Sequence, residues 1–213
     1  PRSTLDRSSA ASDVYKRQGA YSPTPIIDEK LGTEIQEKII DKTIHAMRDE
    51  GFEFKGFLYA GIMIKDGIPY VLEYNVRMGD PECQPILMRL DSDLYDYLHA
   101  SYEGKLNELP EISWKNQYSV CVVLASKGYP SSYPTGDEIT GFENLSSDAF
   151  VFHAGTKKQD DKIKSNGGRV LGVTALGSSL EDAINNAYDA CNHIHWTNKY
   201  HRTDIGKKGL SNL

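Results

Sequence analysis

The sequence has few cysteines, and none stands at a metal-binding spacing. Cys83, Cys121 and Cys191 are the three cysteines among 213 residues, and they lie far apart. No CxxC motif or cysteine–histidine cluster is present, so the sequence predicts no zinc site. An odd number of scattered thiols is typical of a reducing compartment. We therefore expect a cytoplasmic protein.

The chain also lacks a long apolar run and a surplus of basic charge. No segment approaches the ~18–20 apolar residues that a membrane helix requires, and the N-terminus has no apolar signal core. The 24 Lys and Arg residues stand against 30 Asp and Glu, which gives a net charge of −6. Nonspecific nucleic-acid binding favours a basic surface. The sequence therefore predicts a globular protein of one or two domains that binds neither membranes nor nucleic acids.

The stretch from residue 71 to 84 combines strand-forming residues with an unusual set of polar side chains. Residues 71–74 favour a buried strand. Because side chains alternate along a strand, Glu73, Asn75 and Arg77 are expected on one face. Mg²⁺ prefers carboxylate and amide oxygens, and an arginine fork binds phosphate oxygens. This row therefore suits a metal ion and a polyphosphate.

An exposed strand face carries such a polar row by chance in many proteins. Here the row lies on the second arm of a predicted hairpin, formed by residues 57–64 and 68–75 around an Asp66-Gly67 turn. A charged row inside a sheet with two apolar faces is costly unless it is paired or coordinates a metal. This context favours the metal interpretation.

The row Glu73-x-Asn75-x-Arg77 resembles the metal and phosphate strand of the ATP-grasp ligases. The following residues, Arg77-Met-Gly-Asp-Pro-Glu-Cys-Gln84, closely resemble the signature of the phosphoribosylamine–glycine ligase (glycinamide ribonucleotide synthetase) family, with Met78 in place of the usual Phe or Leu. Further blocks follow the family's order, so that the resemblance covers roughly residues 19 to 206: Gly19-Ala-Tyr-Ser-Pro23, Gly56-Phe-Leu-Tyr-Ala-Gly61, His153-Ala-Gly-Thr156, Asn166-Gly-Gly-Arg-Val170 and Arg202-Thr-Asp-Ile-Gly206.

The resemblance implies an α+β fold, in which the C-terminal part of an ATP-grasp domain (residues 19–103) precedes a small mixed β-rich domain with one helix (residues 118–206). We expect a linker over residues 104–117 and a tail over residues 207–213. Residues 1–18 are polar and aperiodic, and we expect a foreign or disordered stretch there. The family's N-terminal half is missing, so the chain is expected to have little activity alone.

The resemblance also implies a reaction. In the family, ATP phosphorylates the carboxylate of glycine, and the amine of 5-phosphoribosylamine then attacks the glycyl phosphate. The products are glycinamide ribonucleotide, ADP and phosphate, in de novo purine biosynthesis. Glu73 and Asn75 would hold Mg²⁺ or Mn²⁺ at the ATP phosphates. Arg77 would bind ATP and stabilise the transferred phosphoryl group, and Asp80 is the second catalytic candidate.

Other residues are expected to bind substrates. Asp80 and Glu82 follow the metal strand and would bind an amine, Ser22 lies in a loop that borders the substrate pocket in the family, and Gly167 and Arg169 suit a phosphate. Because residues 57–64 contain no carboxylate, either Glu73 bridges two ions or the chain holds one ion firmly. Two other functions remain open, namely another ATP-grasp carboxylate–amine ligase and a noncatalytic module of a multifunctional purine protein.

Periodicity predicts the remaining elements. Helices are expected over residues 31–50 (capped by Asp28 or Thr33), 81–90, 93–102 (capped by Ser92, with Leu94, Tyr95 and Leu98 inward) and 179–195 (opened by a capping box at Ser178 and Glu181). Strands are expected over residues 118–126, 136–142, 149–154, 162–165 and 169–175, with an Asn166-Gly167 hairpin turn before the last.

Overall fold

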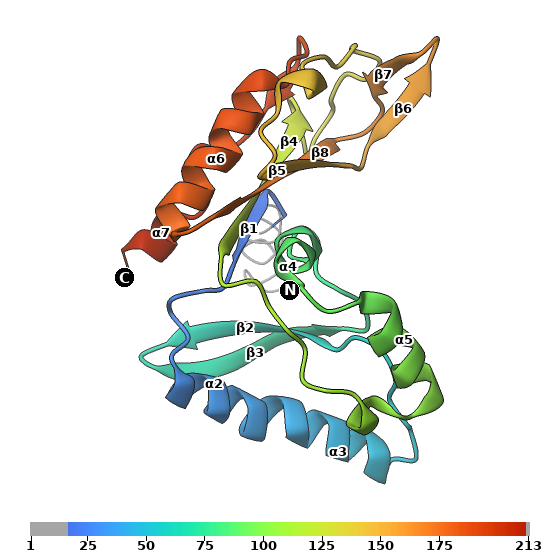
Figure 1. Cartoon of the computed structure of the whole chain (residues 1–213), viewed down its shortest axis with the longest axis vertical. Helices are drawn as coiled ribbons and strands as arrows, with labels where there is room; N and C mark the ends of the chain where they lie inside the picture. Colours follow the sequence, from blue (N-terminus) through green and yellow to red (C-terminus); the bar gives the residue numbers. More distant parts are fainter. Residues whose placement is uncertain (1–16, 212–213) are drawn as a thin grey trace, which may run out of the picture. The chain divides into compact units, whose positions relative to one another are not determined.

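The computed structural model describes residues 17–211, which form two compact units (Figure 1). The described part of unit 1 consists of residues 17–23, 80–89 and 115–211, and unit 2 consists of residues 24–79 and 90–114. The chain therefore passes between the units four times, after Pro23, Gly79, Arg89 and Trp114. This division differs from the sequence-based boundaries, because two short early segments pack on the sheet of the C-terminal part. The expectation for residues 1–18 falls almost entirely outside the described residues.

Unit 1 is built on a five-stranded antiparallel sheet in the order β1-β4-β8-β5, in which β9 also pairs with β4. A separate two-stranded sheet joins β6 and β7. The strands are β1 (Gly19–Ser22), β4 (Tyr118–Ser126), β5 (Ala149–His153), β6 (Thr156–Gln159), β7 (Lys162–Ser165), β8 (Arg169–Gly177) and β9 (Lys199–Tyr200).

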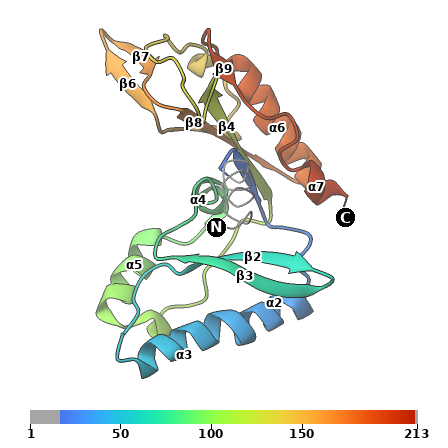
Figure 2. The ribbon, with the colours of Figure 1, turned by 180° about the vertical axis from the view of Figure 1, so that it is seen from behind.

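The core of unit 1 lies between this sheet and helix α6 (Leu180–His193), which runs along one face of the sheet (Figures 1 and 2). The helix buries the predicted apolar face, including Ala187 and Cys191. Every residue of β4 after Tyr118 is buried, because α4 (Cys83–Arg89) also contacts β4 and β8. Burying each Val or Leu side chain contributes about 1.5–3 kcal/mol. The predicted bounds of β4 are confirmed.

The predicted capping box of α6 is shifted by one residue. Ser179 is the N-cap, and its Oγ accepts a 3.0 Å hydrogen bond from the amide of Asp182. Ser178 instead donates from its hydroxyl to the Asp182 carboxylate at 2.5 Å. At the other end of the helix, Lys199 donates to the carbonyls of Cys191 (2.9 Å) and Ile194 (2.5 Å) and so satisfies terminal acceptors.

One strand prediction and one turn prediction in unit 1 are wrong. Residues 136–142 make only isolated bridges, through Glu138 and Thr140, and then enter the short 3₁₀ helix η3 (Phe142–Asn144). The hairpin turn lies at Asp160 and Asp161, whose φ angles of 52° and 57° are those of a type I′ turn. The Asn166-Gly167 pair therefore makes no hairpin, and β6 was missed.

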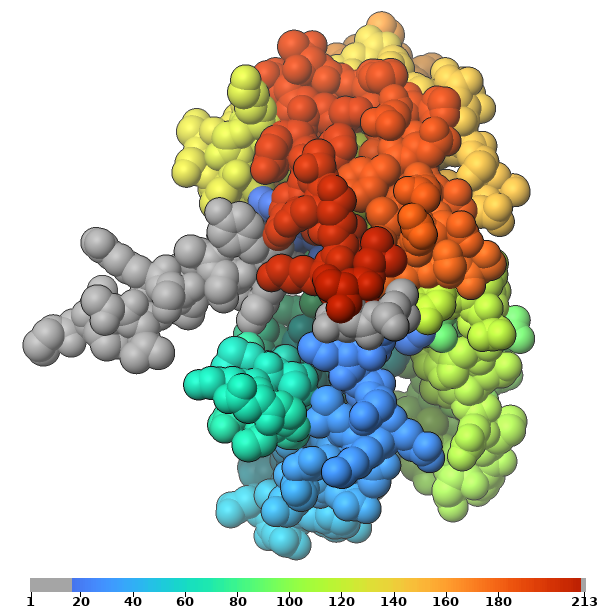
Figure 3. Space-filling view, turned by 90° about the vertical axis from the view of Figure 1, so that its left-hand side faces the viewer, coloured from blue at the N-terminus to red at the C-terminus, as the bar shows by residue number. Residues whose placement is uncertain are grey.

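The C-terminal segment of unit 1 packs against α6 and β1. Tyr188 on α6 accepts a 2.9 Å hydrogen bond from the amide of Ile205 and donates one of the same length to the carbonyl of Arg202. Helix α7 (Lys207–Leu210) follows, within the predicted tail. A Cβ on Gly209 would lie 3.0 Å from the ring of Tyr21 on β1, so these distant segments are in close contact. Figure 3 shows this segment (red) and α6 (orange) as one continuous surface.

Unit 2 contains a continuous helical stretch and a two-stranded sheet. Helix α2 (Glu29–Ile35) leads through a π-helical segment (Gln36–Asp41) into α3 (Lys42–Asp49). Asp28, one of the two predicted caps, accepts from the amide of Leu31 at 2.7 Å. Strands β2 (Tyr59–Lys65) and β3 (Ile68–Asn75) form the predicted hairpin. Its turn residues Asp66 and Gly67 have φ angles of 53° and 74°, as a type I′ turn requires.

The second segment of unit 2 forms α5 (Leu94–Glu103) and the short 3₁₀ helix η2 (Leu106–Glu108). Asp93 caps α5 by accepting from the amide of Tyr95 at 2.8 Å. The predicted cap, Ser92, instead accepts from the amide of Ser113. Two residues expected inward, Tyr95 and Leu98, are 70% and 43% exposed. No helix among residues 17–211 is both long enough and apolar enough to span a bilayer.

Strand β3 is more exposed than the sequence predicted. Val71, Leu72 and Tyr74 are 39%, 49% and 42% exposed, so the expectation of a buried strand is wrong. The physical reason is that β2 and β3 pair only with each other among the described residues. A two-stranded sheet covers too little apolar surface to bury both of its faces.

Candidate functional site

The predicted metal strand places Glu73 directly opposite Gly61 in the β2–β3 hairpin. A Cβ on Gly61 would lie 2.9 Å from Cγ of Glu73, so the glutamate side chain crosses the space that Gly61 leaves open. A register shift between Gly61 and Ile62 marks a bulge at this point. Bulges commonly redirect a side chain near a site. The absence of a side chain at Gly61 therefore allows the observed direction of the Glu73 side chain.

Glu73 carries no hydrogen bond or ion pair to any residue that the structure describes. Asn75 is two residues further along β3 and pairs through its backbone with Tyr59. Alternation along the strand puts both side chains on the same face. Arg77 lies beyond the end of β3, and its Nη1 donates to the carbonyl of Met78 at 2.8 Å. The strand therefore orders two of the three predicted residues.

The face that carries Glu73 is opposite the face of β3 that contacts α3. On the other face, Tyr74 makes a 2.8 Å hydrogen bond with Thr43 of α3. A groove of about 450 Å³ lies between α3 and β3, with Ile39, Phe52 and Val71 among its lining residues. The groove has the volume of a small-molecule pocket, but Glu73 and Asn75 do not line it. The candidate metal ligands thus belong to the face that α3 does not cover.

The donor set at this face fits Mg²⁺ or Mn²⁺ in part. Glu73 offers a carboxylate that pairs with none of the described residues, and Asn75 offers an amide oxygen; hard divalent ions prefer such ligands. Residues 17–211 contain no cluster of three or more His, Cys, Asp and Glu side chains that would hold an ion alone. Mg²⁺ commonly completes its coordination with substrate phosphates and water. The two residues therefore fit an ion that is shared with a nucleotide.

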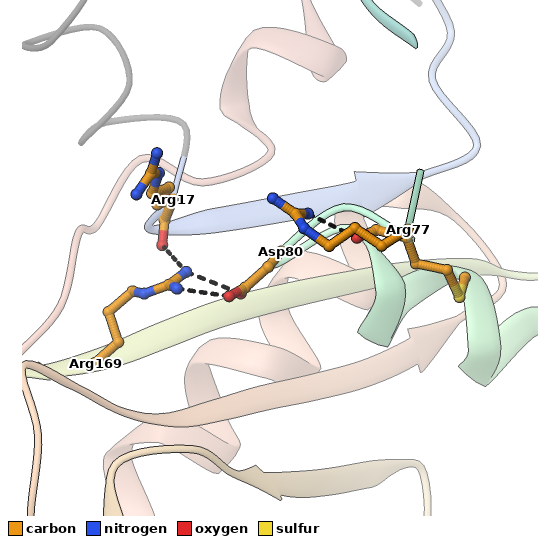
Figure 4. Close-up of polar contacts among 5 residues, drawn as sticks. Arg17, Arg77, Asp80 and Arg169 are labelled. Atoms are coloured by element: carbon orange, nitrogen blue, oxygen red, sulfur yellow. Dashed lines mark hydrogen bonds and ion pairs between the residues drawn. The ribbon is translucent and has the colours of Figure 1, made fainter. Parts of the chain in front are cut away.

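In unit 1, Asp80 and Arg169 form a bidentate ion pair (Figure 4). The two Nη atoms of Arg169 donate to the two carboxylate oxygens of Asp80 at 2.8 and 2.5 Å. Nη1 also donates to the carbonyl of Arg17 at 3.4 Å. The arginine is more buried than the aspartate, with 24% and 53% of their side chains exposed. The structure thus joins two residues to which the sequence analysis gave separate roles.

The two glycine-containing blocks of unit 1 meet backbone to backbone. The amide of Gly155 donates to the carbonyl of Arg169 at 3.0 Å, and the amide of Asn166 donates to the carbonyl of Gly155 at 2.7 Å. A Cβ on Gly167 would lie 2.9 Å from Cα of Gly155. Gly167 therefore allows close approach rather than a left-handed turn. This packing fixes the start of β8, from which Arg169 extends.

Ser22 and Glu82 also lie in unit 1. The hydroxyl of Ser22 accepts a 2.9 Å hydrogen bond from Nη1 of Arg89. Glu82 is half-buried just before α4, and its carbonyl accepts from the amide of Ile86 at 3.3 Å. Burial, followed by the charges of Asp80 and Glu82 among the smaller causes, raises the pKa of the Cys121 thiol to about 12.

The predicted site residues thus fall into two groups. Glu73, Asn75 and Arg77 belong to unit 2, whereas Ser22, Asp80, Glu82, Gly167 and Arg169 belong to unit 1. Sequence reasoning included Gly61 in a family-like block without giving it a role at the site, and it missed Arg89. Gly61 was detectable as a glycine in a strand interior, which commonly marks close approach by another group. Arg89 had no signal, because its partners are distant in sequence.

Comparisons with known families match most of the chain. The ATP-grasp (A) domain of phosphoribosylglycinamide synthetase matches residues 17–83, and the C domain of the same enzyme matches residues 119–208. The two matches leave out the segment that contains α5 and η2. They agree with the predicted α+β fold that contains part of an ATP-grasp domain.

Individual relatives agree with the two domain matches. The phosphoribosylamine–glycine ligase of Vibrio parahaemolyticus is 46% identical over 195 residues, which are 91% of this chain and 45% of the relative. A bifunctional purine biosynthetic protein of Pichia angusta is 45% identical over 193 residues, 90% of this chain and 24% of that protein. The crystal structure of the Thermotoga maritima phosphoribosylamine–glycine ligase has a TM-score of 0.77 at 34% identity, and the match covers 88% of this chain and 46% of that one. The chain spans about half the length of its single-function relatives.

Proposed function

Because the chain belongs to the phosphoribosylglycinamide synthetase family, we propose that it is part of an ATP-dependent ligase that joins glycine to 5-phosphoribosylamine. The products would be glycinamide ribonucleotide, ADP and phosphate. The observation that carries this proposal is the carboxylate of Glu73, which is exposed, has no partner among residues 17–211 and shares one face of an ATP-grasp hairpin with Asn75. Glu73 is exposed, so its carboxylate and the neighbouring amide oxygen of Asn75 are hard ligands that an ion shared with a nucleotide could reach.

Glu73 and Asn75 would hold Mg²⁺ or Mn²⁺ together with the phosphates of ATP. A bound ion would supply electrostatic stabilisation of the charge that develops on the transferred phosphoryl group. Arg77 would add a cation at the same phosphates, once its guanidinium exchanges the neighbouring carbonyl of Met78 for an anion. The chemistry requires little more from these residues than positioning and charge stabilisation.

Asp80 would orient the amine that attacks the glycyl phosphate. Its pairing with Arg169 fixes both carboxylate oxygens, and each oxygen retains a lone pair for a substrate N–H. Glu82, Ser22 and Gly167 complete the proposed substrate-binding set, with Arg169 also a candidate contact for the phosphate of 5-phosphoribosylamine. None of the three cysteines forms a disulfide in the described structure, which fits a reducing compartment, and we propose the cytoplasm.

The proposal is tested by complementation. The 213-residue chain is mixed with a separately expressed N-terminal half of the Vibrio parahaemolyticus relative, and glycinamide ribonucleotide formation is measured. We expect turnover in the mixture, little or none in either part, and loss of at least about a hundredfold with Glu73→Gln. Absence of turnover in a mixture that forms a complex would argue against the ligase function.

A noncatalytic role in a multifunctional protein is the second candidate. It is favoured by the match to the bifunctional purine protein of Pichia angusta. The same assay separates the two functions, because a noncatalytic module would bind the N-terminal half without restoring turnover. Calorimetry of Mg²⁺-ATP binding to the chain alone, with Glu73→Gln as control, would show whether the metal strand is already assembled.

A further inference from the structure

Arg89 lies where the chain leaves unit 1 for the third of its four passages between the units. Its Nε donates to the carbonyl of Gln117 at 2.7 Å, and its Nη1 donates to the hydroxyl of Ser22 at 2.9 Å. Ser22 is two residues before the first passage, and Gln117 is three residues after the fourth. One guanidinium therefore joins chain segments that adjoin three different passages.

Backbone and lysine contacts strengthen the same cluster. The amide of Lys115, the first residue after the fourth passage, donates to the carbonyl of Arg89 at 2.8 Å. Its Nζ donates to the carbonyl of Met88 at 3.2 Å. The end of α4 thus donates a hydrogen bond to residue 117 and accepts hydrogen bonds from residue 115. Every contact in this cluster lies inside unit 1.

The remaining passage has an arginine of its own. Asp80 is the first residue after Gly79, and Arg169 holds it through the bidentate pair described above. Chain segments at such crossings are ordinarily among the more mobile parts of a protein. A guanidinium has a rigid, planar arrangement of donors, so it fixes the relative direction of two acceptors better than a flexible amine does. All four passages are therefore fixed on the side of unit 1.

We infer that Arg89 is a positioning residue that couples the segments around Ser22, Arg89 and Lys115–Gln117 and thereby orients Ser22. Its effect on catalysis rests on the proposed function, whereas its effect on these segments does not. In the restored ligase, Arg89 would act through Ser22 and through the ends of the segments that lead into unit 2. It would touch neither substrate nor metal.

Hydrogen–deuterium exchange of the full chain tests the inference. In Arg89→Met we expect the peptides 17–25 and 113–118 to exchange about tenfold faster together. The core of β4 and β8 should be unchanged. Arg89→Lys keeps the charge but cannot reach both acceptors, so it should resemble Arg89→Met. The matched control Arg202→Met removes another arginine that forms an ion pair in unit 1, with Asp204, and should leave both peptides unchanged.

Three outcomes would overturn the inference. Faster exchange in only one of the two peptides would show that they are not coupled. Equal acceleration throughout β4 and β8 would make Arg89 a general stability residue. Because Arg89→Met removes several contacts at once, Ser22→Ala provides a milder variant, and failure of this variant to accelerate exchange in residues 113–118 would also refute the coupling.

The complementation assay adds a catalytic readout. Arg89→Met should lower kcat by about tenfold and leave the KM for ATP unchanged, since ATP binds at the residues of β3. An equal rise in the KM for ATP would count against a positioning role through Ser22. If the unmodified chain restores no turnover, the proposed function fails, and the exchange experiment still decides the coupling.

Discussion

The contact between Gly61 and Glu73 predicts an energetic coupling that can be measured without any activity. A methyl group at residue 61 would lie 2.9 Å from Cγ of Glu73, closer than carbon atoms approach without displacement. Cγ is near the backbone, so Glu73 must leave its rotamer by some tens of degrees, which costs about 0.5–1.5 kcal/mol. Gly61 itself has no positive φ, and alanine restricts the unfolded chain, which stabilises the fold by about 0.4–1 kcal/mol.

These two effects oppose each other in Gly61→Ala, so its net change in unfolding free energy should be small. In a Glu73→Ala background the clash is absent, and the same substitution should stabilise the protein by about 0.4–1 kcal/mol. The double-mutant cycle should therefore give a coupling energy of about 0.5–1.5 kcal/mol. Urea unfolding of the four proteins measures it.

A control cycle pairs Gly61→Ala with Asn75→Ala, whose side chain does not lie over Gly61, and it should be additive. A coupling with Glu73 no larger than the control, or below about 0.3 kcal/mol, would refute the geometry. Gly61→Ala should also weaken Mn²⁺-ATP binding by about two- to tenfold where Glu73 is a ligand. Calorimetry tests this second effect.

Three other perturbations have defined outcomes. Hydrogen bonds from Ser178 and Ser179 lower the pKa of Asp182 in the folded chain. The Asp182 carboxylate therefore stabilises the fold above the unfolded-state pKa of about 3.9. This contribution to stability is lost as the pH falls through the lower pKa of the folded state. The difference in melting temperature between the protein and Asp182→Asn should shrink from about pH 5 to pH 2, and a constant difference would contradict this origin. Burial raises the pKa of Cys121 and of Cys191 to about 12. A thiol reagent at about pH 8 should therefore modify at most Cys83 in the native chain and all three cysteines in urea. Rapid modification of two thiols in the native chain would contradict the burial of Cys121 and Cys191. Arg169→Met should cost about 1 kcal/mol or less, because Asp80 is half-exposed, and Asp80→Asn should add little further loss in urea unfolding; a fully additive double variant would show that the pair does not act as a unit.

Local patterns predicted much of the fold. The 3.6-residue spacing of Ala183, Ala187 and Cys191 identified the buried face of α6, and the valine-rich run gave the bounds of β4. These elements are decided by their own residues, because each is covered by apolar neighbours on a predictable side. The Asp66-Gly67 turn was predicted for the same local reason.

Long-range packing decided the elements that were wrong. Asn166-Gly167 has the composition of a hairpin turn, yet Gly167 serves the close approach of Gly155, and Asp160-Asp161 makes the turn instead. The exposure of Leu72 and Tyr74 followed from the number of strands available to pair, which no single segment encodes. Local sequence patterns likewise do not predict that each unit is formed by separate chain segments.

The kind of candidate site could be predicted from the sequence, but the contacts between its side chains could not. The alternation of Glu73 and Asn75 along β3 follows from strand geometry, so both could be placed before the structure was known. The bidentate pair of Asp80 and Arg169 joins residues 89 positions apart, and each alone had suggested a different ligand. Sequence spacing carries no information about such a pair unless the fold is already known.

The packing of Tyr21 against Gly209 has a consequence for the order of the chain. Strand β1 and helix α7 are neighbours in unit 1, although they belong to opposite ends of the described sequence. A circular permutant that begins at Thr24 and joins residue 211 to residue 17 through a short flexible linker would keep β1 in place. Such a permutant would make unit 1 continuous from residue 115 through β1 and remove the first passage between the units. The connectivity of this protein is therefore separable from its architecture.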